Sequence, residues 1–373
     1  MDATTLAVYG DSPYGTSNAD VAQFNATPAF IDTINQDPSV SLVMHVGDIH
    51  SGKQKCTQAY DQSIFADWKA FADPLVYTPG DNEWTDCHKT AEGGGLWNST
   101  TSIIDFQYDS PGVLTDFAAG NPVANLLLVR SIFFPTPGVT LGQNTMKVHS
   151  QALEYDPAHP SDRNYVENVW WERSNVLFVT INLPGGSNND DDNWYGTPTK
   201  SQDQIDEVAQ RTGADLRWLD TAFAKAKADK VSALVIGAQA DMWDTEKGAA
   251  HQANYEPIVT KVSDLTKDLG KPVLMINGDS HVYRSDNPFS STGSCATEGG
   301  SCTTHTPADI YAIHPTDTHG NAYDVPNFHR IVVHGSTAPM EWLKLKVDPK
   351  QNDPNGVSSF GPFSWTRVGT GLG

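Results

Sequence analysis

Short apolar runs recur along the first part of the chain, and each one stops at a turn that contains Gly or Asp. The runs at residues 6–9, 41–46 and 75–77 predict buried strands. Between them, residues 19–35 and 59–71 have apolar side chains at helical spacing. Strands that alternate with helices at this pace predict an α/β sheet.

The rest of the chain adds one clear helix and several further strands. Residues 202–228 predict a long amphipathic helix, and residues 185–192 predict a loop rich in turn-forming residues. Further strands are expected at residues 165–172, 175–183, 233–238, 273–276, 330–334 and 342–347.

The middle of the chain, from about residue 92 to 162, is irregular and aromatic. We interpret it as an insertion that shapes a binding cleft. The apolar run at 124–134 is interrupted by Asn125, Arg130 and Ser131, so we expect a buried strand there. No apolar stretch approaches the roughly 20 residues that cross a bilayer. Because no composition break suggests a linker, we expect residues 1–373 to form a single domain.

The chain is strongly acidic, with 24 basic against 45 acidic residues and a formal net charge of −21. Such a field repels nucleic acids and anionic membranes, so neither is an expected partner. The charge is typical of a solubility-promoting surface. It also leaves room for carboxylates that serve as metal ligands, whose charge a bound cation would offset.

The four cysteines fall into two local pairs, Cys56 with Cys87 and Cys295 with Cys302. Pairing within each couple would staple loops, which favours an oxidising compartment and a secreted or periplasmic protein. Neither couple has the close Cys-x-x-Cys spacing of a zinc site.

Polar residues follow five of the predicted strands. In open α/β sheets, ligands bind beyond the carboxyl ends of the strands. Each of these residues has an ordinary alternative as a turn or capping residue, or as a buried histidine with its hydrogen bonds satisfied. Their joint placement instead predicts a site for one or two hard cations. The residues are Asp11, Asp48, Asp81, Gln239, and Asp279 with His281.

The order of these motifs resembles the calcineurin-like metallophosphoesterase superfamily, which includes the purple acid phosphatases. That family's motifs run Asp-x-His, Gly-Asp-x-x-Asp, Gly-Asn-His-(Asp/Glu), a later His, and Gly-His-x-His. The corresponding segments here are Gly10-Asp11-Ser12-Pro13, Gly47-Asp48-Ile49-His50, Gly80-Asp81-Asn82-Glu83, Gln239 and Gly278-Asp279-Ser280-His281. The resemblance implies an αββα sandwich of two mixed sheets flanked by helices, with the metal site at the strand carboxyl ends.

Several positions depart from the family pattern. Purple acid phosphatases also lack the first His, but Ser51 stands where they carry a Tyr. The remaining changes mostly exchange nitrogen ligands for oxygen ligands, which favours calcium, magnesium, manganese or iron over zinc. They place Asp81 at a metal-binding Asn, Asn82 at the substrate-contacting His, Gln239 at a His ligand and Asp279 at the first His of the last motif.

The resemblance also implies roles for single residues. Asp48 would bridge two metals, and a bridging hydroxide would attack phosphorus. The first metal's other ligands would be Asp11 and His281, with His50 as a further candidate. Those of the second would be Asp81 and Asp279, with Gln239 as a weaker one.

The residues that would act on the phosphoryl group are less defined by the resemblance. Asn82 could donate a hydrogen bond to a phosphoryl oxygen, and His88 is the nearest alternative proton donor. Arg284 could pair with phosphate or with Glu83.

The leading hypothesis is a metal-dependent hydrolase of phosphate esters, either monoesters or diesters, acting on a small extracellular molecule. One alternative is a degenerate member that binds metal or a phosphorylated ligand without turnover. Another is a carbohydrate- or surface-binding protein with structural calcium. The chain has no Gly-x-Ser-x-Gly elbow and no Gly-rich nucleotide fingerprint, which disfavours serine-hydrolase chemistry and nucleotide-binding folds.

Overall fold

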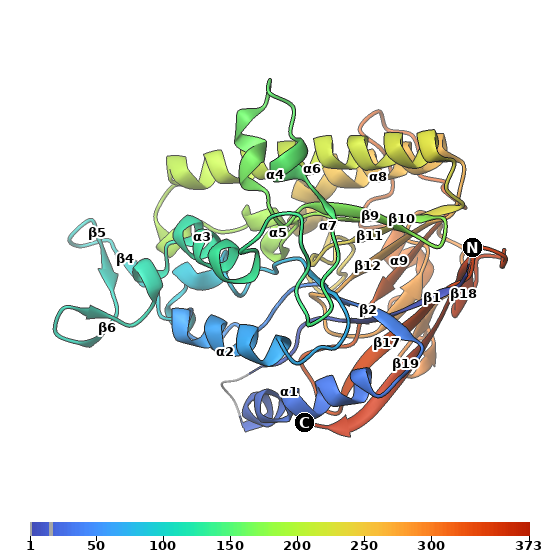
Figure 1. Cartoon of the computed structure of the whole chain (residues 1–373). Helices are drawn as coiled ribbons and strands as arrows, with labels where there is room; N and C mark the ends of the chain where they lie inside the picture. The colour runs from blue at the N-terminus through green and yellow to red at the C-terminus, as the bar shows by residue number, and fades with distance from the viewer. Residues whose placement is uncertain (1, 15–17) are drawn as a thin grey trace.

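Two large sheets lie face to face in the computed structural model, with helices on their outer sides (Figure 1). The structure describes residues 2–14 and 18–373. In the six-stranded sheet, β1, β2 and β3 run parallel and the other strands are antiparallel. Its order is β18 (Ser359–Phe360), β19 (Phe363–Leu372), β17 (Met340–Val347), β1 (Thr4–Tyr9), β2 (Val40–His45) and β3 (Leu75–Tyr77).

The second sheet has nine strands, of which β10, β11, β12 and β16 are parallel neighbours. Its order is β15 (Gly300–Ser301), β14 (Ala296–Thr297), β13 (Arg284–Asp286), β16 (Phe328–Val332), β12 (Val273–Asn277), β11 (Ala233–Gly237), β10 (Val176–Thr180), β9 (Val169–Arg173) and β8 (His149–Ser150).

Three apolar clusters hold these layers together. One lies between the sheets and joins, for example, Leu6 of β1 to Phe178 of β10. A second packs the nine-stranded sheet against α6 (Gln202–Asp229) and α8 (Glu256–Leu269). The third packs the six-stranded sheet against α1 (Asn18–Asn35), α2 (Gln58–Trp68) and α3 (Pro122–Phe133). The predicted sandwich of two mixed sheets between helices is confirmed.

The strand expected at residues 124–134 is wrong, because this segment is the helix α3. The signal lies just before the apolar run: the Asn121 side chain accepts a hydrogen bond from the amide of Ala124 at 2.9 Å, and Pro122 occupies the first turn. Val129 and Phe133, four residues apart, are buried, while Arg130 pairs with Glu167. Asn125, four residues before Val129, shares this buried face and donates to the Phe117 and Asn121 carbonyls, while Arg130 and Ser131 lie on other faces of the helix.

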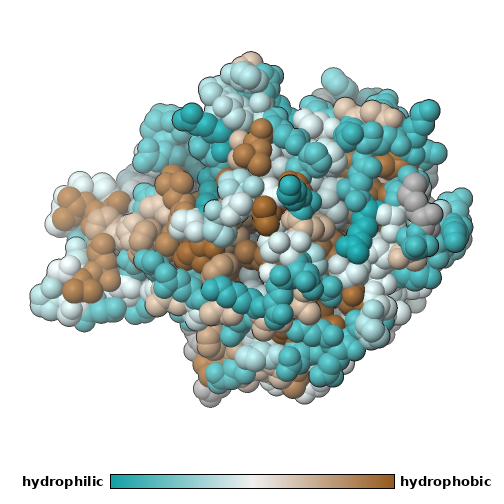
Figure 2. Space-filling model, viewed as in Figure 1, coloured by the Kyte–Doolittle hydropathy of each residue, from teal (hydrophilic) through white to brown (hydrophobic). Residues whose placement is uncertain are grey.

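The segment 92–162 also contains two hairpins that project from the body as an arm, at the left of Figure 1. They are β4 (Gly95–Asn98) with β5 (Ile103–Phe106), and β6 (Tyr108–Ser110) with β7 (Val113–Leu114). Exposed apolar side chains gather on this arm, as the brown patches in Figure 2 show; they include Leu96, Ile103 and Val113. Tyr108 of the same arm is also exposed. The cleft-shaping role of the segment stays a prediction.

The remaining short elements are α4 (Gln151–Glu154), α5 (Gly185–Asn189), α7 (Ala249–Gln252) and α9 (Pro307–Tyr311). In α5, Gly186, Ser187 and Asn188 have positive φ, so the segment is a left-handed turn, consistent with the predicted loop. Among the described residues, no helix is long and apolar enough to cross a membrane.

Candidate metal centre

The five polar strand ends meet where the two sheets face each other. Asp11, Asp48 and Asp81 follow β1, β2 and β3 of the six-stranded sheet, while Gln239 and Asp279 follow β11 and β12 of the other sheet. Because these are parallel neighbours within each sheet, their carboxyl ends lie along one edge. The convergence expected from the sequence is therefore present.

Four of the candidate ligands adopt the left-handed backbone conformation. The φ angles are 47° at Asp11, 59° at Asp48, 73° at Asp279 and 66° at His281. Residues other than Gly adopt this conformation rarely, and such strained positions cluster at functional sites. The turns after β1, β2 and β12 therefore hold their side chains in unusual directions, toward a common point.

Asp11 lies at the centre of one half of the cluster. Its two carboxylate oxygens accept hydrogen bonds from the Asp279 amide at 2.9 and 3.1 Å. The His281 Nε2 lies 3.6 Å from Asp11 Oδ1. Asp11, Asp48 and His281 each offer one ligand atom, and these three atoms lie within 4.8 Å of one another. The three residues could therefore bind the same ion.

Gln239 joins the other half of the cluster. Its Nε2 donates to Asp48 Oδ2 at 3.2 Å and to Asp81 Oδ1 at 2.9 Å, while its Oε1 accepts from the Gly185 amide at 2.5 Å. Gln239 thus directs its donor, and not its oxygen, at the two carboxylates. In this arrangement it orients Asp48 and Asp81.

Glycines allow the carboxylates to approach the backbone. A Cβ on Gly80 would lie 2.0 Å from Asp48 Oδ1, and one on Gly185 would lie 2.6 Å from Asp81 Oδ2 and 2.8 Å from Asp279 Oδ1. Real Cβ contacts are never this short, so any other residue would displace the ligands. The motif glycine Gly80 is therefore a packing requirement of the site.

Burial and mutual repulsion disfavour the ionised form of these carboxylates. Burial raises the pKa of Asp11, Asp48 and Asp279 well above the ordinary range, and the charge of Asp81 raises each of them further. The pKa of Asp81 is raised to about 7, first by burial and then by Asp86. Several carboxylate oxygens and one imidazole fit a hard cation, whose charge would turn this repulsion into attraction.

Asn82 lies at the edge of the cluster. Its amide donates to Asp48 Oδ1 at 3.2 Å, and its side-chain Nδ2 donates to Asp48 Oδ2 at 3.3 Å and to the His50 carbonyl at 2.8 Å. The sulfurs of the Cys56–Cys87 disulfide lie 3.4 and 3.7 Å from the Asn82 carbonyl. The disulfide therefore supports the loop that carries Asn82.

Two predicted histidines have side chains that lie elsewhere. The His50 Nδ1 contacts the Ser51 carbonyl at 3.0 Å, and its Nε2 faces Cys56 Sγ at 4.0 Å. The His88 Nδ1 accepts from the Tyr195 amide at 3.0 Å, and its Nε2 lies 3.5 Å from Asp192. Neither ring is brought to the carboxylate cluster.

Arg284 does not pair with Glu83, so that expected alternative is wrong. Its Nε donates to Asp286 within strand β13. Glu83 instead accepts hydrogen bonds from the Tyr77 hydroxyl at 2.5 Å and the Gly80 amide at 2.6 Å. Glu83 thereby fixes the turn after β3, while Arg284 lines a neighbouring pocket.

The sequence analysis missed two residues at the site. The Tyr14 hydroxyl lies 2.9 Å from His281 Nε2, and the Asp241 amide donates to Asp279 Oδ2 at 2.9 Å. Tyr14 lies three residues after Asp11, and Asp241 lies two residues after Gln239. This closeness to a predicted strand end is the only sequence signal that either residue carries.

Both predicted disulfides, Cys56–Cys87 and Cys295–Cys302, are present. No family model and no curated protein sequence matches the chain.

The solved structures that are similar to almost the whole chain include the following three. A purple acid phosphatase from yellow lupin (Lupinus luteus) seeds is 11% identical over 98% of this chain, with a TM-score of 0.38. GAP50, the anchor in the inner membrane complex of Plasmodium, is 11% identical over 99%, with a TM-score of 0.42. A putative 5'-nucleotidase from Staphylococcus aureus is 9% identical over 98%, with a TM-score of 0.43.

The chain covers these structures to different extents. It spans 54% of the length of the phosphatase and nucleotidase structures and 89% of GAP50.

Proposed function

We propose that this chain hydrolyses phosphate esters with the help of one or two hard cations held at the strand ends. The observation that carries the proposal is the convergence of oxygen-bearing side chains from both sheets, close enough for Asp11, Asp48 and His281 to share an ion. Buried carboxylates that repel one another are costly without a cation. Their retention at a strained site points to a function that outweighs that cost.

The residues divide the work by position. Asp11, Asp48 and His281 would hold one cation, and Asp81 and Asp279, which face the same point near Gly185, would hold a second. Bound cations supply charge neutralisation at the phosphoryl group and lower the pKa of the attacking water.

Two donors border this space. The Asn82 Nδ2 lies 3.3 Å from Asp48 Oδ2 and could orient a phosphoryl oxygen. Burial and the charge of Asp48 raise the pKa of Tyr14 well above its ordinary value, so its hydroxyl keeps its proton and can donate a hydrogen bond.

The supply of oxygen ligands favours calcium, magnesium, manganese or iron over zinc. The two disulfides support an oxidising compartment, and hence a secreted or periplasmic enzyme with an extracellular small-molecule substrate.

Steady-state hydrolysis of p-nitrophenyl phosphate and its bis-ester tests the proposal. The protein is stripped with EDTA and reloaded with each cation in turn. Wild type should regain activity with a hard cation, and Asp48→Asn should lower kcat/KM by more than about 100-fold, because even outer partners of metal ligands contribute about 10–100-fold. The control Asp220→Asn changes an exposed carboxylate on α6 that pairs with Lys261. Wild type that is inactive with every cation, or an active Asp48→Asn, would overturn the proposal.

A second candidate is a protein that binds a cation and a phosphorylated ligand without turnover. It is favoured by Asn82, which stands where the resembled family carries its substrate-contacting His, and by His88, the alternative proton donor, whose Nδ1 accepts from the Tyr195 amide away from the cluster. Cation binding by calorimetry together with no hydrolysis of either ester would select this candidate.

A further inference from the structure

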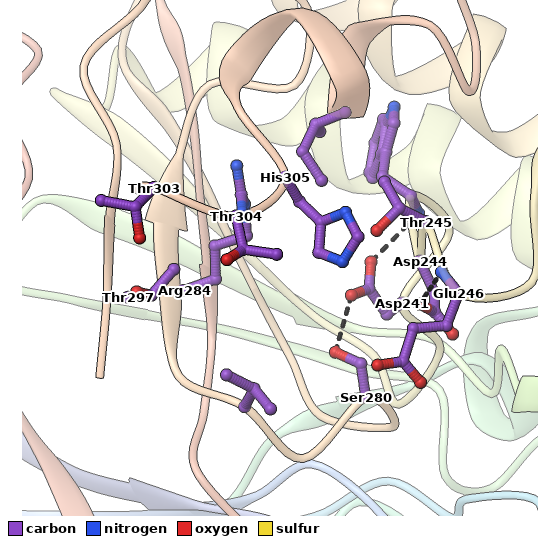
Figure 3. A pocket seen from close by; sticks show the side chains of 13 residues that line it. Asp241, Asp244, Thr245, Glu246, Ser280, Arg284, Thr297, Thr303, Thr304 and His305 are labelled. Atoms are coloured by element: carbon purple, nitrogen blue, oxygen red, sulfur yellow. Dashed lines mark hydrogen bonds between the residues drawn. The ribbon is translucent and has the colours of Figure 1, made fainter. Parts of the chain in front are cut away.

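A pocket of about 280 Å³ adjoins the candidate metal centre (Figure 3). Asp241 and Ser280 form part of its wall, and the Ser280 hydroxyl donates to Asp241 Oδ2 at 2.8 Å. The Asp241 amide in turn donates to the candidate ligand Asp279. One residue therefore separates this pocket from the metal centre.

A smaller cavity of about 120 Å³ shares lining residues with both the metal centre and the larger pocket. Asp81 and Asp279 line it, and Asp244 lines both it and the larger pocket. Asp244 is thus shared by the two cavities, which places the larger pocket beside the one that Asp81 and Asp279 line.

Two buried donors in the pocket wall need an acceptor. Arg284 is 7% exposed and Trp243 1% exposed. Within the described part of the chain, Arg284 Nη2 and Trp243 Nε1 have no hydrogen-bond partner. Arg284 is fixed in place because its Nε donates to Asp286. Both atoms have almost no accessible surface, so a ligand oxygen would reach them after a small shift of the pocket wall. An unmade hydrogen bond at a buried donor costs about 1–3 kcal/mol, which favours such a contact.

Acceptors and hydroxyls lie on the other walls. Asp244 and Glu246 supply carboxylates, and Thr304 supplies a hydroxyl (Figure 3). A second anionic group on the ligand would meet these carboxylates, and a cationic group would leave the donors on Arg284 and Trp243 unmatched. An uncharged group with several hydroxyls satisfies both sets, because each hydroxyl donates and accepts.

We propose that this pocket binds the alcohol part of the substrate as an uncharged polyhydroxylated group, so that the substrate is a sugar or polyol phosphate. The inference rests on the proposed function, since it assigns the leaving group of that reaction. The pocket volume lies near the lower end of small-molecule sites, which suits one monosaccharide ring. In the reaction, water oxygen bonds to phosphorus, the ester P–O bond breaks, and the leaving oxygen takes a proton, which releases phosphate and the free sugar.

Substrate selectivity tests the pocket. We compare kcat/KM for glucose 6-phosphate, phosphocholine and phenyl phosphate with the cation-loaded protein. Wild type should prefer glucose 6-phosphate over phosphocholine by at least tenfold. Thr304→Trp, at an exposed position of the wall, fills the pocket and should lower the ratio of glucose 6-phosphate to phenyl phosphate at least tenfold. The matched control Thr101→Trp, on the exposed turn between β4 and β5, should keep the wild-type ratio.

The outcomes separate this inference from the proposed function. Hydrolysis of all three esters without preference, or an equal loss on all three in Thr304→Trp, overturns the inference and leaves the function standing. If no ester is hydrolysed, saturation-transfer NMR with glucose tests the pocket alone. A glucose signal in wild type and in Thr101→Trp that disappears in Thr304→Trp supports the pocket, and its absence in wild type overturns it.

Discussion

Replacing Asp81 by Asn should stabilise the cation-free protein while weakening its response to cations. Asp81 is buried, and its Oδ1 accepts a hydrogen bond from Gln239 Nε2 at 2.9 Å, which an Asn oxygen can also accept. Burial, then Asp86 and Glu83, raise its pKa to about 7 from 3.8, against the opposing charge of Lys89. The ionised carboxylate of Asp81 therefore destabilises the folded protein, and the protonated form does not.

The size of the effect follows from this pKa. An acid whose folded-state pKa is raised destabilises the fold above that pKa, and the penalty fades as the pH falls toward the unfolded value. Each unit is worth about 1.4 kcal/mol, so Asp81 costs about 4 kcal/mol at pH 8 and about 2 kcal/mol at pH 5. With an unfolding entropy of about 2.1 cal/mol/K for each of the 373 residues, these values correspond to about 5 °C and 2 °C in Tm.

Thermal unfolding followed by circular dichroism in EDTA, at pH 5 and pH 8, measures this difference. Asp220→Asn serves as the control, since its exposed pair with Lys261 contributes about 0–1 kcal/mol. Manganese at 100 times its Kd should then stabilise wild type by about 2.7 kcal/mol, and Asp81→Asn by less. A variant that unfolds at or below the wild-type temperature in EDTA at pH 8 would refute this reasoning.

Three other predictions concern Gly80, the buried His329 and the Cys56–Cys87 disulfide. Gly80→Ala places a methyl group 2.0 Å from Asp48 Oδ1, so it should destabilise by about 1–3 kcal/mol and lower ester hydrolysis at least tenfold; a fully active variant in the same assay would contradict this. Burial lowers the pKa of His329 from 6.5 to about 4, so its protonation in the unfolded state should cost about 2 kcal/mol between pH 7.5 and 5. Other groups also titrate in this range, so urea unfolding at the two pH values should show a change that is about 2 kcal/mol more destabilising in wild type than in His329→Asn, and equal changes would argue against it. Replacing both Cys56 and Cys87 by Ser opens a 31-residue loop and should cost about 3–4 kcal/mol in urea unfolding, a loss that would be absent if the bond were not formed.

The sheet framework could be predicted because its strands are continuous apolar runs that end at polar turns. β1, β2, β3, β11 and β12 all have that form, and all lie where their runs placed them. Among the elements that were not predicted at all, α8 and β19 are the longest. The helix α8 buries Ile258, Val259 and Val262 at helical spacing, so its sequence does carry a helical signal. The strand β19 contains Gly369, and its burial alternates only partly.

The sequence was sufficient to predict where the candidate site lies, but not how its side chains are oriented. Strand ends fix which residues meet, because parallel strands share an edge. They do not fix which atom of a side chain faces the cluster. Gln239 presents its nitrogen because the amide of Gly185, which is distant in sequence, donates to its oxygen. His50 turns toward Cys56, which is close in sequence and is held by its disulfide to Cys87. Tyr14 joins the site through the turn after β1, which carries no periodic signal.

Anomalous diffraction from crystals soaked in manganese tests the central claim most directly. We expect a peak within coordination distance of Asp11, Asp48 and His281, and a second near Asp81 and Asp279 if two ions bind. Crystals of Asp48→Asn under the same soak should lose the first peak. Wild-type crystals with no anomalous peak among these side chains would contradict the account.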